Sequence, residues 1–280
     1  MNPSSTRAQD TRGTPAEPAV SGVPVPLPDT LPGTDVDSHD ELFLPRSYSE
    51  NLALPVDADD EIEFWRRADQ AHARRARRYQ DPVYRVAARS AHRSDTVLDV
   101  GCGIGDNLVR RVAGRARRCV GTDIPSAITV ARDLFPDREW IAGDLRSEAL
   151  WSTFDALDPD LVICADVIEH VEDPILFLER LRWLLAGSSS LVLSTPDRSR
   201  IERQPALGPP ADPTHIREWT EPEMTQLLRS TGFSIRSSRH VLTRRYPVTV
   251  LETKMVVWRA LHRRAVPGPR STMVFELTAT

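Results

Sequence analysis

The stretch VLDVGCGIGDNL, which begins at residue 97, places three glycines at alternate positions directly after an apolar run that contains an acid, Asp99. Lacking side chains, Gly101, Gly103 and Gly105 let the backbone approach a ligand closely and adopt dihedral angles barred to other residues. A dinucleotide fingerprint has the spacing G-x-G-x-x-G, whereas here Asp106 stands where its last glycine would be. A carboxylate there would repel a pyrophosphate, so the two acids favour a ligand with positive charge.

This D-x-G-x-G-x-G pattern resembles the first motif of class I S-adenosylmethionine-dependent methyltransferases, and the resemblance covers most of residues 95–235. The segments HIREWT and STPD further resemble bacterial members that tailor small molecules, glycans or natural products. The resemblance implies a Rossmann-like α/β fold with a seven-stranded, mostly parallel sheet and S-adenosyl-L-methionine as cofactor. It also implies that the three glycines lie against the methionine and ribose of the cofactor, and that Asp99 helps to fix the turn and the cofactor's amino group.

Acids also stand at the ends of the next three expected strands. Asp123 lies 22 residues after the first glycine, near the offset of about 20 residues at which an acid meets ribose hydroxyls. By the resemblance, Ile124 faces the adenine, Asp144 meets the adenine amino group with Leu145 beside the ring, and Asp166 lies where methionine and acceptor meet. Each acid alone would also suit a turn or a helix cap. Together with Asp99, they place acids at four consecutive strands around the glycine turn, which favours a cofactor site.

Two histidines are candidates for a catalytic base. His170 follows the fourth expected strand in DVIEH, and His215 stands in THIREWT beside Arg217 and Glu218. A hydroxyl acceptor would gain about 10²–10⁴-fold from such a base, whereas an amine would need none of that strength. The structural alternatives stay open: His170 would then only cap or pack a helix, and His215 would only anchor a loop.

The leading hypothesis for function is therefore methyl transfer to a small molecule, with the hydroxyl of a sugar or secondary metabolite as acceptor. The run ADVIEH replaces the N/D-P-P-Y/F run of amino-directed nucleic-acid methyltransferases, which argues against nucleic acid as the acceptor. The alternatives are N- or C-methylation of a natural product, a nicotinamide-dependent oxidoreductase, and a non-catalytic partner subunit that keeps the fold.

Apolar β runs alternate with helical periods from residue 96 onward, which predicts a parallel sheet with helices on both faces. Seven strands are expected, at 96–100, 119–124, within 138–145, and at 161–167, 190–195, 234–242 and 271–279. Helices are expected at 57–80, 82–92, 106–116, 126–135, 173–187, 249–264 and 218–233, the last starting at Thr220 and stopping at Gly232.

Composition changes along the chain predict three parts. Residues 1–40 are rich in Pro, Ser, Thr, Gly and Asp and are expected to be a disordered tail. Residues 41–94 are expected to form an N-terminal helical cap, and 95–280 the methyltransferase domain. Within that domain, residues 197–216 form a Pro- and Arg-rich stretch long enough to be a lid-like loop.

The bulk properties favour a cytoplasmic protein, and the resemblance implies a bacterial one. The net charge of −4 gives no general attraction to nucleic acid or membrane, and no segment is apolar for the length of a membrane span. The number of cysteines, three, is odd, and no two of them have the spacing of metal ligands. We therefore expect reduced thiols and predict no metal site. The oligomeric state stays open, with a homodimer among the options.

Overall fold

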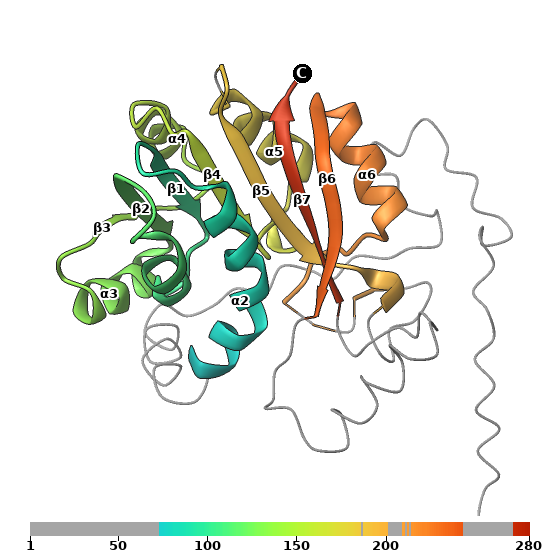
Figure 1. Cartoon of the computed structure of the whole chain (residues 1–280). Coiled ribbons are helices and arrows are strands. Elements are labelled where there is room, and N and C mark those ends of the chain that lie inside the picture. The colour runs from blue at the N-terminus through green and yellow to red at the C-terminus, as the bar shows by residue number, and fades with distance from the viewer. Residues whose placement is uncertain (1–72, 186, 201–208, 211, 213, 243–270) are drawn as a thin grey trace, which may run out of the picture. The chain divides into compact units, whose positions relative to one another are not determined.

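The computed structural model describes residues 73–185, 187–200, 209–210, 212, 214–242 and 271–280 (Figure 1). All of them belong to the second of the two units into which the chain divides, Asp35–Thr280. The expected tail at 1–40, the expected helix at 249–264 and most of the expected helix at 57–80 lie outside the described residues. So do residues 201–208 in the middle of the predicted lid-like loop.

A seven-stranded sheet forms the centre of this unit, in the order β3-β2-β1-β4-β5-β7-β6. The first five strands run parallel to one another, whereas β7 lies antiparallel between β5 and β6. The strands are β1 Thr96–Val100, β2 Arg118–Asp123, β3 Glu139–Ala142, β4 Leu161–Ala165, β5 Ser190–Pro196, β6 Phe233–Leu242 and β7 Ser271–Ala279. This arrangement confirms the predicted Rossmann-like fold class.

The helices cover both faces of this sheet (Figure 1). They are α2 Ala73–Ser90, α3 Pro125–Leu134, α4 Glu148–Asp155, α5 Pro174–Trp183 and α6 Glu221–Ser230, together with the π-helix η2 Leu108–Val112 and the 3₁₀ turns η3 Ile168–His170 and η4 Arg198–Arg200. As predicted, α6 is capped by Thr220, which exchanges hydrogen bonds with Glu223, and the chain turns at Gly232 with a positive φ.

The alternation of side chains along β1 distributes its residues between two cores. Leu98 and Val100 join a cluster with α4, α5 and α6, whereas Val97 joins a second cluster with α2, η2 and α3. Asp99 has the same parity as Val97, so its carboxyl group lies on the α2 side of the sheet. The register of β1 therefore decides which helix can contact this acid.

The N-terminal helix differs from expectation. Instead of two helices separated near Pro82, α2 is continuous from Ala73 to Ser90, with the proline inside it. A proline removes one helical hydrogen bond, but the residues that follow it, Val83, Tyr84 and Ala87, are fully or almost fully buried in the second core. This packing keeps the chain helical through the proline.

Two further predictions are corrected. The helix expected at 106–116 ends at Val112, where Ala113 donates to the carbonyl of Leu108 in a π-type turn. The helix α4 was missed, although its buried side chains Leu150, Trp151 and Phe154 follow a helical spacing. None of the helices in the described residues has both the length and the apolar composition needed to cross a bilayer.

Candidate active site

The glycine turn lies at the carboxyl end of β1 and is tied to β2. The amide groups of Gly101 and Cys102 both donate to the carbonyl oxygen of Thr122, at 2.9 and 3.0 Å. All three glycines have positive φ, of 78°, 57° and 73°. A Cβ on Gly105 would lie 2.0 Å from the Trp140 ring, so the backbone here has both a conformation and a close neighbour that exclude a side chain.

Asp99 is completely buried beneath this turn. Its Oδ2 accepts a hydrogen bond of 2.9 Å from the hydroxyl of Tyr84, while its Oδ1 is buried without a partner in the described part of the chain. Burial raises the pKa of Asp99 to about 8, with a smaller contribution from the charge of Asp123, while the Tyr84 bond opposes the shift. An orphaned carboxylate oxygen of this kind is costly unless a cationic or hydrogen-donating group meets it.

Asp123 links the end of β2 to the glycine turn. Its Oδ2 accepts from the Gly103 amide at 2.7 Å, and its Oδ1 accepts from the Ile124 amide at 2.8 Å. Asp99 and Asp123 both act on Cys102 within the turn, because their charges add to burial in raising the pKa of that thiol. The structure therefore brings together the glycines and the first two predicted acids.

The third predicted acid is differently placed. Asp144 is exposed at the end of β3, and Arg146 holds both of its carboxylate oxygens at 2.6 to 3.1 Å. The Arg146 hydrogen bonds lower the pKa of Asp144. The neighbouring Leu145 is half-buried against the first core, and Ile124 is half-buried at the start of α3. Their proposed contacts with adenine stay predictions.

Asp166 follows β4 with φ of 56°, a left-handed conformation that Asp tolerates better than most residues. Ser194 on β5 donates to its Oδ1 at 2.7 Å. Burial raises the pKa of Asp166, opposed by the Ser194 hydrogen bond and by the charge of His215. The predicted acid therefore lies within electrostatic reach of a predicted base, although 49 residues separate them in the sequence.

The two candidate bases meet in space. The imidazole rings of His170 and His215 have centroids 4.8 Å apart and stand edge to face at 82°. His170 Nδ1 donates to the carbonyl oxygen of Thr214 at 2.7 Å, and His215 Nδ1 lies 2.5 Å from Glu218 Oε1. Because Nδ1 is the hydrogen-bonding nitrogen in each ring, the basic nitrogen of the neutral form is Nε2.

Electrostatics separate these two histidines. Loss of water contacts and the nearby His215 lower the pKa of His170. Desolvation also acts to lower the pKa of His215, but the Glu218 hydrogen bond and the charges of Glu169, Glu218 and Asp212 outweigh it, so the net shift is upward. Glu218 is itself 1% exposed. His215 is thus a partly buried imidazole oriented by a buried carboxylate, an arrangement typical of general bases.

Glu169 completes this cluster. It is 1% exposed, its Oε2 accepts from the Thr195 hydroxyl at 2.9 Å, and burial together with the charge of Asp166 raises its pKa to about 8. Ligand atoms of Glu169, His170 and His215 all lie within 4.8 Å of one another. The three could therefore also hold a divalent cation, a site that the sequence analysis did not predict.

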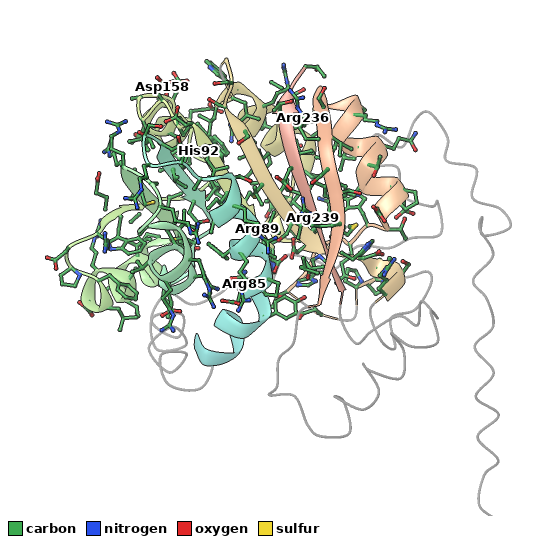
Figure 2. The ribbon with its side chains drawn as sticks, viewed as in Figure 1. Arg85, Arg89, His92, Asp158, Arg236 and Arg239 are labelled. Carbon is green, nitrogen blue, oxygen red and sulfur yellow. The ribbon has the colours of Figure 1, made fainter. Side chains whose placement is uncertain are left out.

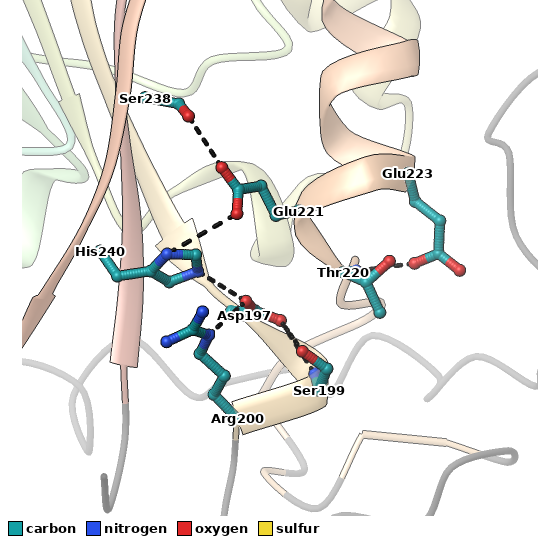
Figure 3. Close-up of polar contacts among 8 residues, drawn as sticks. All are labelled: Asp197, Ser199, Arg200, Thr220, Glu221, Glu223, Ser238 and His240. Carbon is teal, nitrogen blue, oxygen red and sulfur yellow. Dashed lines mark hydrogen bonds and ion pairs between the residues drawn. The ribbon is translucent and has the colours of Figure 1, made fainter. Parts of the chain in front are cut away.

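A second imidazole–carboxylate pair lies at the end of β5 (Figure 3). His240 Nε2 lies 2.6 Å from Oδ2 of Asp197, which is 1% exposed, and Ser199 donates to Oδ1 of the same acid. His240 Nδ1 also approaches Glu221 at 3.7 Å. These contacts join β5, β6 and α6 at the start of the predicted lid-like loop, and the sequence analysis singled out neither member of the pair.

Comparison with known proteins identifies the family. The family model described as a methyltransferase domain matches residues 71–238, more than half of the chain. The chain belongs to this methyltransferase family. A probable S-adenosylmethionine-dependent methyltransferase of Mycobacterium tuberculosis H37Rv is 33% identical over 160 residues, 56% of this chain and 54% of that protein. The family-model match confirms the methyltransferase family predicted from the glycine turn.

Two other comparisons concern a second curated relative and a solved structure. The ubiquinone biosynthesis O-methyltransferase of Bradyrhizobium diazoefficiens is 32% identical over 107 residues, 37% of this chain and 40% of that protein. The chain thus spans about half the length, or less, of these curated relatives. The N-methyltransferase NodS of Bradyrhizobium japonicum WM9, solved with S-adenosyl-L-homocysteine, aligns with a TM-score of 0.50 at 17% identity over 79% of this chain and 96% of NodS. This last likeness concerns the fold.

The residues of the turn fit S-adenosylmethionine, because its amino group is cationic and Asp99 offers a buried oxygen that lacks a partner among the described residues. Positive φ at the three glycines gives the close backbone approach that such a ligand needs. Tyr84 and Glu169 are the neighbours that sequence reasoning missed as site residues. The signal for Tyr84 was its place on the buried face of a helix, which also suits an ordinary core residue.

Proposed function

We propose that this protein transfers the methyl group of S-adenosylmethionine to a hydroxyl oxygen of a small molecule, a sugar or secondary metabolite, with His215 as general base. The observation that supports this most directly is the contact of 2.5 Å between His215 Nδ1 and the buried Glu218. A carboxylate in this position fixes the tautomer that leaves Nε2 to accept a proton and stabilises the imidazolium that forms.

S-adenosylmethionine, when bound, supplies a methyl group on a positively charged sulfur. The acceptor oxygen would attack the methyl carbon in line with the carbon–sulfur bond, and S-adenosyl-L-homocysteine would leave. The chain's own part is to orient the acceptor and to take its proton. His215 Nε2 accepts the hydroxyl proton, and Glu218 and Glu169 stabilise the resulting positive charge, since both already raise the pKa of this imidazole. His170 packs edge to face against the ring and limits its rotation.

The cofactor would be held by the residues at the ends of β1 and β2. We assign the amino group to Asp99, the methionine and ribose to Gly101, Gly103 and Gly105, and the ribose hydroxyls to Asp123. The adenine would lie near Ile124, Asp144 and Leu145, and Asp166 would border the acceptor. For Asp144 this requires that Arg146 release part of the carboxylate, because it now bonds both oxygens.

The relatives support oxygen as the atom methylated. Several ubiquinone biosynthesis O-methyltransferases match this chain at 32–35% identity, and their printed names give that reaction for those proteins. An acceptor hydroxyl is a weak nucleophile at neutral pH and benefits from a positioned base, whereas an amine does not require one. The His215–Glu218 pair therefore favours the O-directed hypothesis over the N-directed one.

The test is a panel of hydroxyl- and amine-bearing metabolites incubated with methyl-labelled cofactor, with products identified by mass spectrometry. We expect a labelled hydroxyl compound, and we expect His215→Asn to lower kcat by about 10²-fold or more while the affinity for S-adenosyl-L-homocysteine stays the same. His92→Asn is the matched control, because His92 is exposed at the end of α2 (Figure 2) and lies outside the cluster. Labelling of amines alone, or full activity in His215→Asn, would contradict the proposal.

A further inference from the structure

A pocket of about 350 Å³ between α2 and η2 is lined almost entirely by arginine. Its lining residues are Arg85, Ala88, Arg89, Arg110, Arg111 and Arg115. The first three come from the last turns of α2, where Figure 2 labels Arg85 and Arg89, and the others come from η2 and the turn that follows it. The helix α2, which covers the sheet, and η2, which follows the glycine turn, thus form one basic concavity.

The helical spacing explains why the arginines gather there. On α2, positions 85, 88 and 89 share one face, while Tyr84 and Ala87 on the adjoining face are buried against the sheet. On η2, Leu108 and Val112 enter the core, which leaves Arg110 and Arg111 turned outward. Because α2 and η2 pack against each other, these basic faces meet at the surface.

Described acids neutralise only part of this charge. Asp81 contacts Arg85 at 2.7 Å and Arg111 at 2.5 Å, and Asp106 approaches Arg110 at 4.0 Å. The side chains of Arg89 and Arg115 have no hydrogen bond or ion pair with any described residue, although the Arg115 amide donates to the carbonyl oxygen of Val112. Among the described residues, five guanidinium groups therefore face two carboxylates, which leaves an excess of positive charge concentrated in a concave site.

We propose that this pocket binds the diphosphate group of a small-molecule ligand, at a site separate from the methyl-transfer site. Guanidinium forks match phosphate oxygens in pairs, and several arginines converging on one concavity can hold two linked phosphates. The pocket volume exceeds what a single phosphate fills, and Ala88 is the sole apolar residue among those lining it. With no aromatic side chain in that lining, the pocket recognises the phosphates rather than a base.

The pocket shares no lining residue with the proposed cofactor and acceptor sites. Asp99 and Asp123 lie on β1 and β2, and the histidine pair lies on η3 and before α6, so loss of pocket charge leaves the methyl-transfer groups in place. Binding at this pocket and methyl transfer can therefore be measured independently of each other.

The experiment is calorimetric titration of the full chain with inorganic pyrophosphate at low ionic strength, repeated for Arg89→Gln and Arg115→Gln. We expect binding to the unaltered protein and an affinity about tenfold weaker in each variant, because each loses one charge-assisted contact. Arg229→Gln, on the exposed surface of α6, removes the same charge elsewhere and is expected to leave the affinity unchanged. Binding of S-adenosyl-L-homocysteine should be equal in all four proteins, which shows that each is folded.

Further titrations compare the ligands that could supply the diphosphate group. Equal affinities for adenosine diphosphate and pyrophosphate would support recognition of the diphosphate alone, and adenosine should not bind. Tighter binding of adenosine diphosphate would instead contradict the proposal that the pocket recognises only the phosphates. Absence of heat with pyrophosphate would overturn the proposal. An equal loss of pyrophosphate affinity in Arg229→Gln would also overturn it. So would binding of duplex RNA that pyrophosphate does not displace, because the surface would then bind polyanions without specificity.

Discussion

The Tyr84 hydroxyl donates a hydrogen bond of 2.9 Å to Asp99 Oδ2, and both residues are almost completely buried. This contact joins α2 to β1 directly beneath the glycine turn. It leaves one oxygen of the acid, Oδ1, as the atom available to a bound group. The helix that precedes the sheet therefore takes part in defining the cofactor site, in addition to packing on one face of the sheet.

Replacement of Tyr84 by Phe should weaken cofactor binding and destabilise the fold together. The change removes the hydrogen bond that opposes the upward shift in the pKa of Asp99, so a larger share of the carboxyl stays neutral at neutral pH. We expect the free energy of unfolding to fall by about 1–2 kcal/mol and the affinity for S-adenosyl-L-homocysteine to fall severalfold. Chemical denaturation and calorimetry measure the two. In an Asp99→Asn background the added effect of Tyr84→Phe on affinity should shrink, because the two residues act as one pair.

Asp99→Asn should weaken cofactor binding and should stabilise the folded protein, mainly at high pH. In the folded protein the pKa of Asp99 is about 8, against an ordinary value of 3.8, so between these values the folded state holds more protons than the unfolded state. Stability is therefore expected to fall as the pH rises from about 4 to about 8. The substitution removes only part of this pH dependence, because the pKa of Glu169 is also raised to about 8 and this acid likewise lowers stability as the pH rises. Thermal unfolding at pH 5 and pH 8 checks this: the variant should gain melting temperature mainly at pH 8, and it should lose cofactor affinity at both.

Sequence patterns predicted those features that depend on local chemistry. The glycine spacing, the strand periodicity and the Thr220 cap each follow from a few neighbouring residues, and the structure has all of them. Contacts between segments that are distant in the sequence could not be predicted from such local patterns. The Tyr84–Asp99 bond depends on which face of β1 meets α2, and the edge-to-face contact of His170 and His215 depends on Thr214 and His215 lying against η3. The arginine pocket likewise appears only when α2 and η2 are packed together.

Gly105→Ala should disrupt the turn, whereas Gly114→Ala should not. An alanine at 105 would require a strained φ near 73° and would place its Cβ 2.0 Å from Trp140, so the ring or the turn must move. We expect a loss of about 2–4 kcal/mol in the free energy of unfolding and loss of cofactor binding. Gly114 has no atom within 4 Å of such a Cβ and no positive φ, which makes it the matched control. Equal effects of the two substitutions would show that neither the clash nor the positive φ at 105 matters.

Chelation distinguishes proton transfer from metal assistance at the Glu169–His170–His215 cluster. If the cluster acts through its basic nitrogen, as proposed, methyl transfer should survive prolonged treatment with a chelator and should not rise on addition of Mg²⁺, Mn²⁺ or Zn²⁺. A stimulation of tenfold or more by one cation, lost in Glu169→Gln, would instead assign the three residues to a metal site. Cofactor binding measured in parallel serves as the control, because chelation should leave it unchanged in either case.

The pH dependence of turnover tests the role of Glu218 through His215. A general base must be neutral to accept a proton, and the pKa of His215 is raised, so kcat should decline on the acid side with a midpoint above 6.5, the ordinary pKa of histidine. Glu218→Gln removes a hydrogen bond and a charge that raise this pKa, while desolvation, which lowers it, remains. The acid limb should therefore move to lower pH, and kcat at its plateau should fall because the ring loses its orienting carboxylate. Asp197→Asn breaks the corresponding pair with His240 at the end of β5 and is expected to leave the limb where it is (Figure 3). A merely structural role for Glu218 predicts lower activity with no displacement of the pH profile, so the position of the limb decides between them.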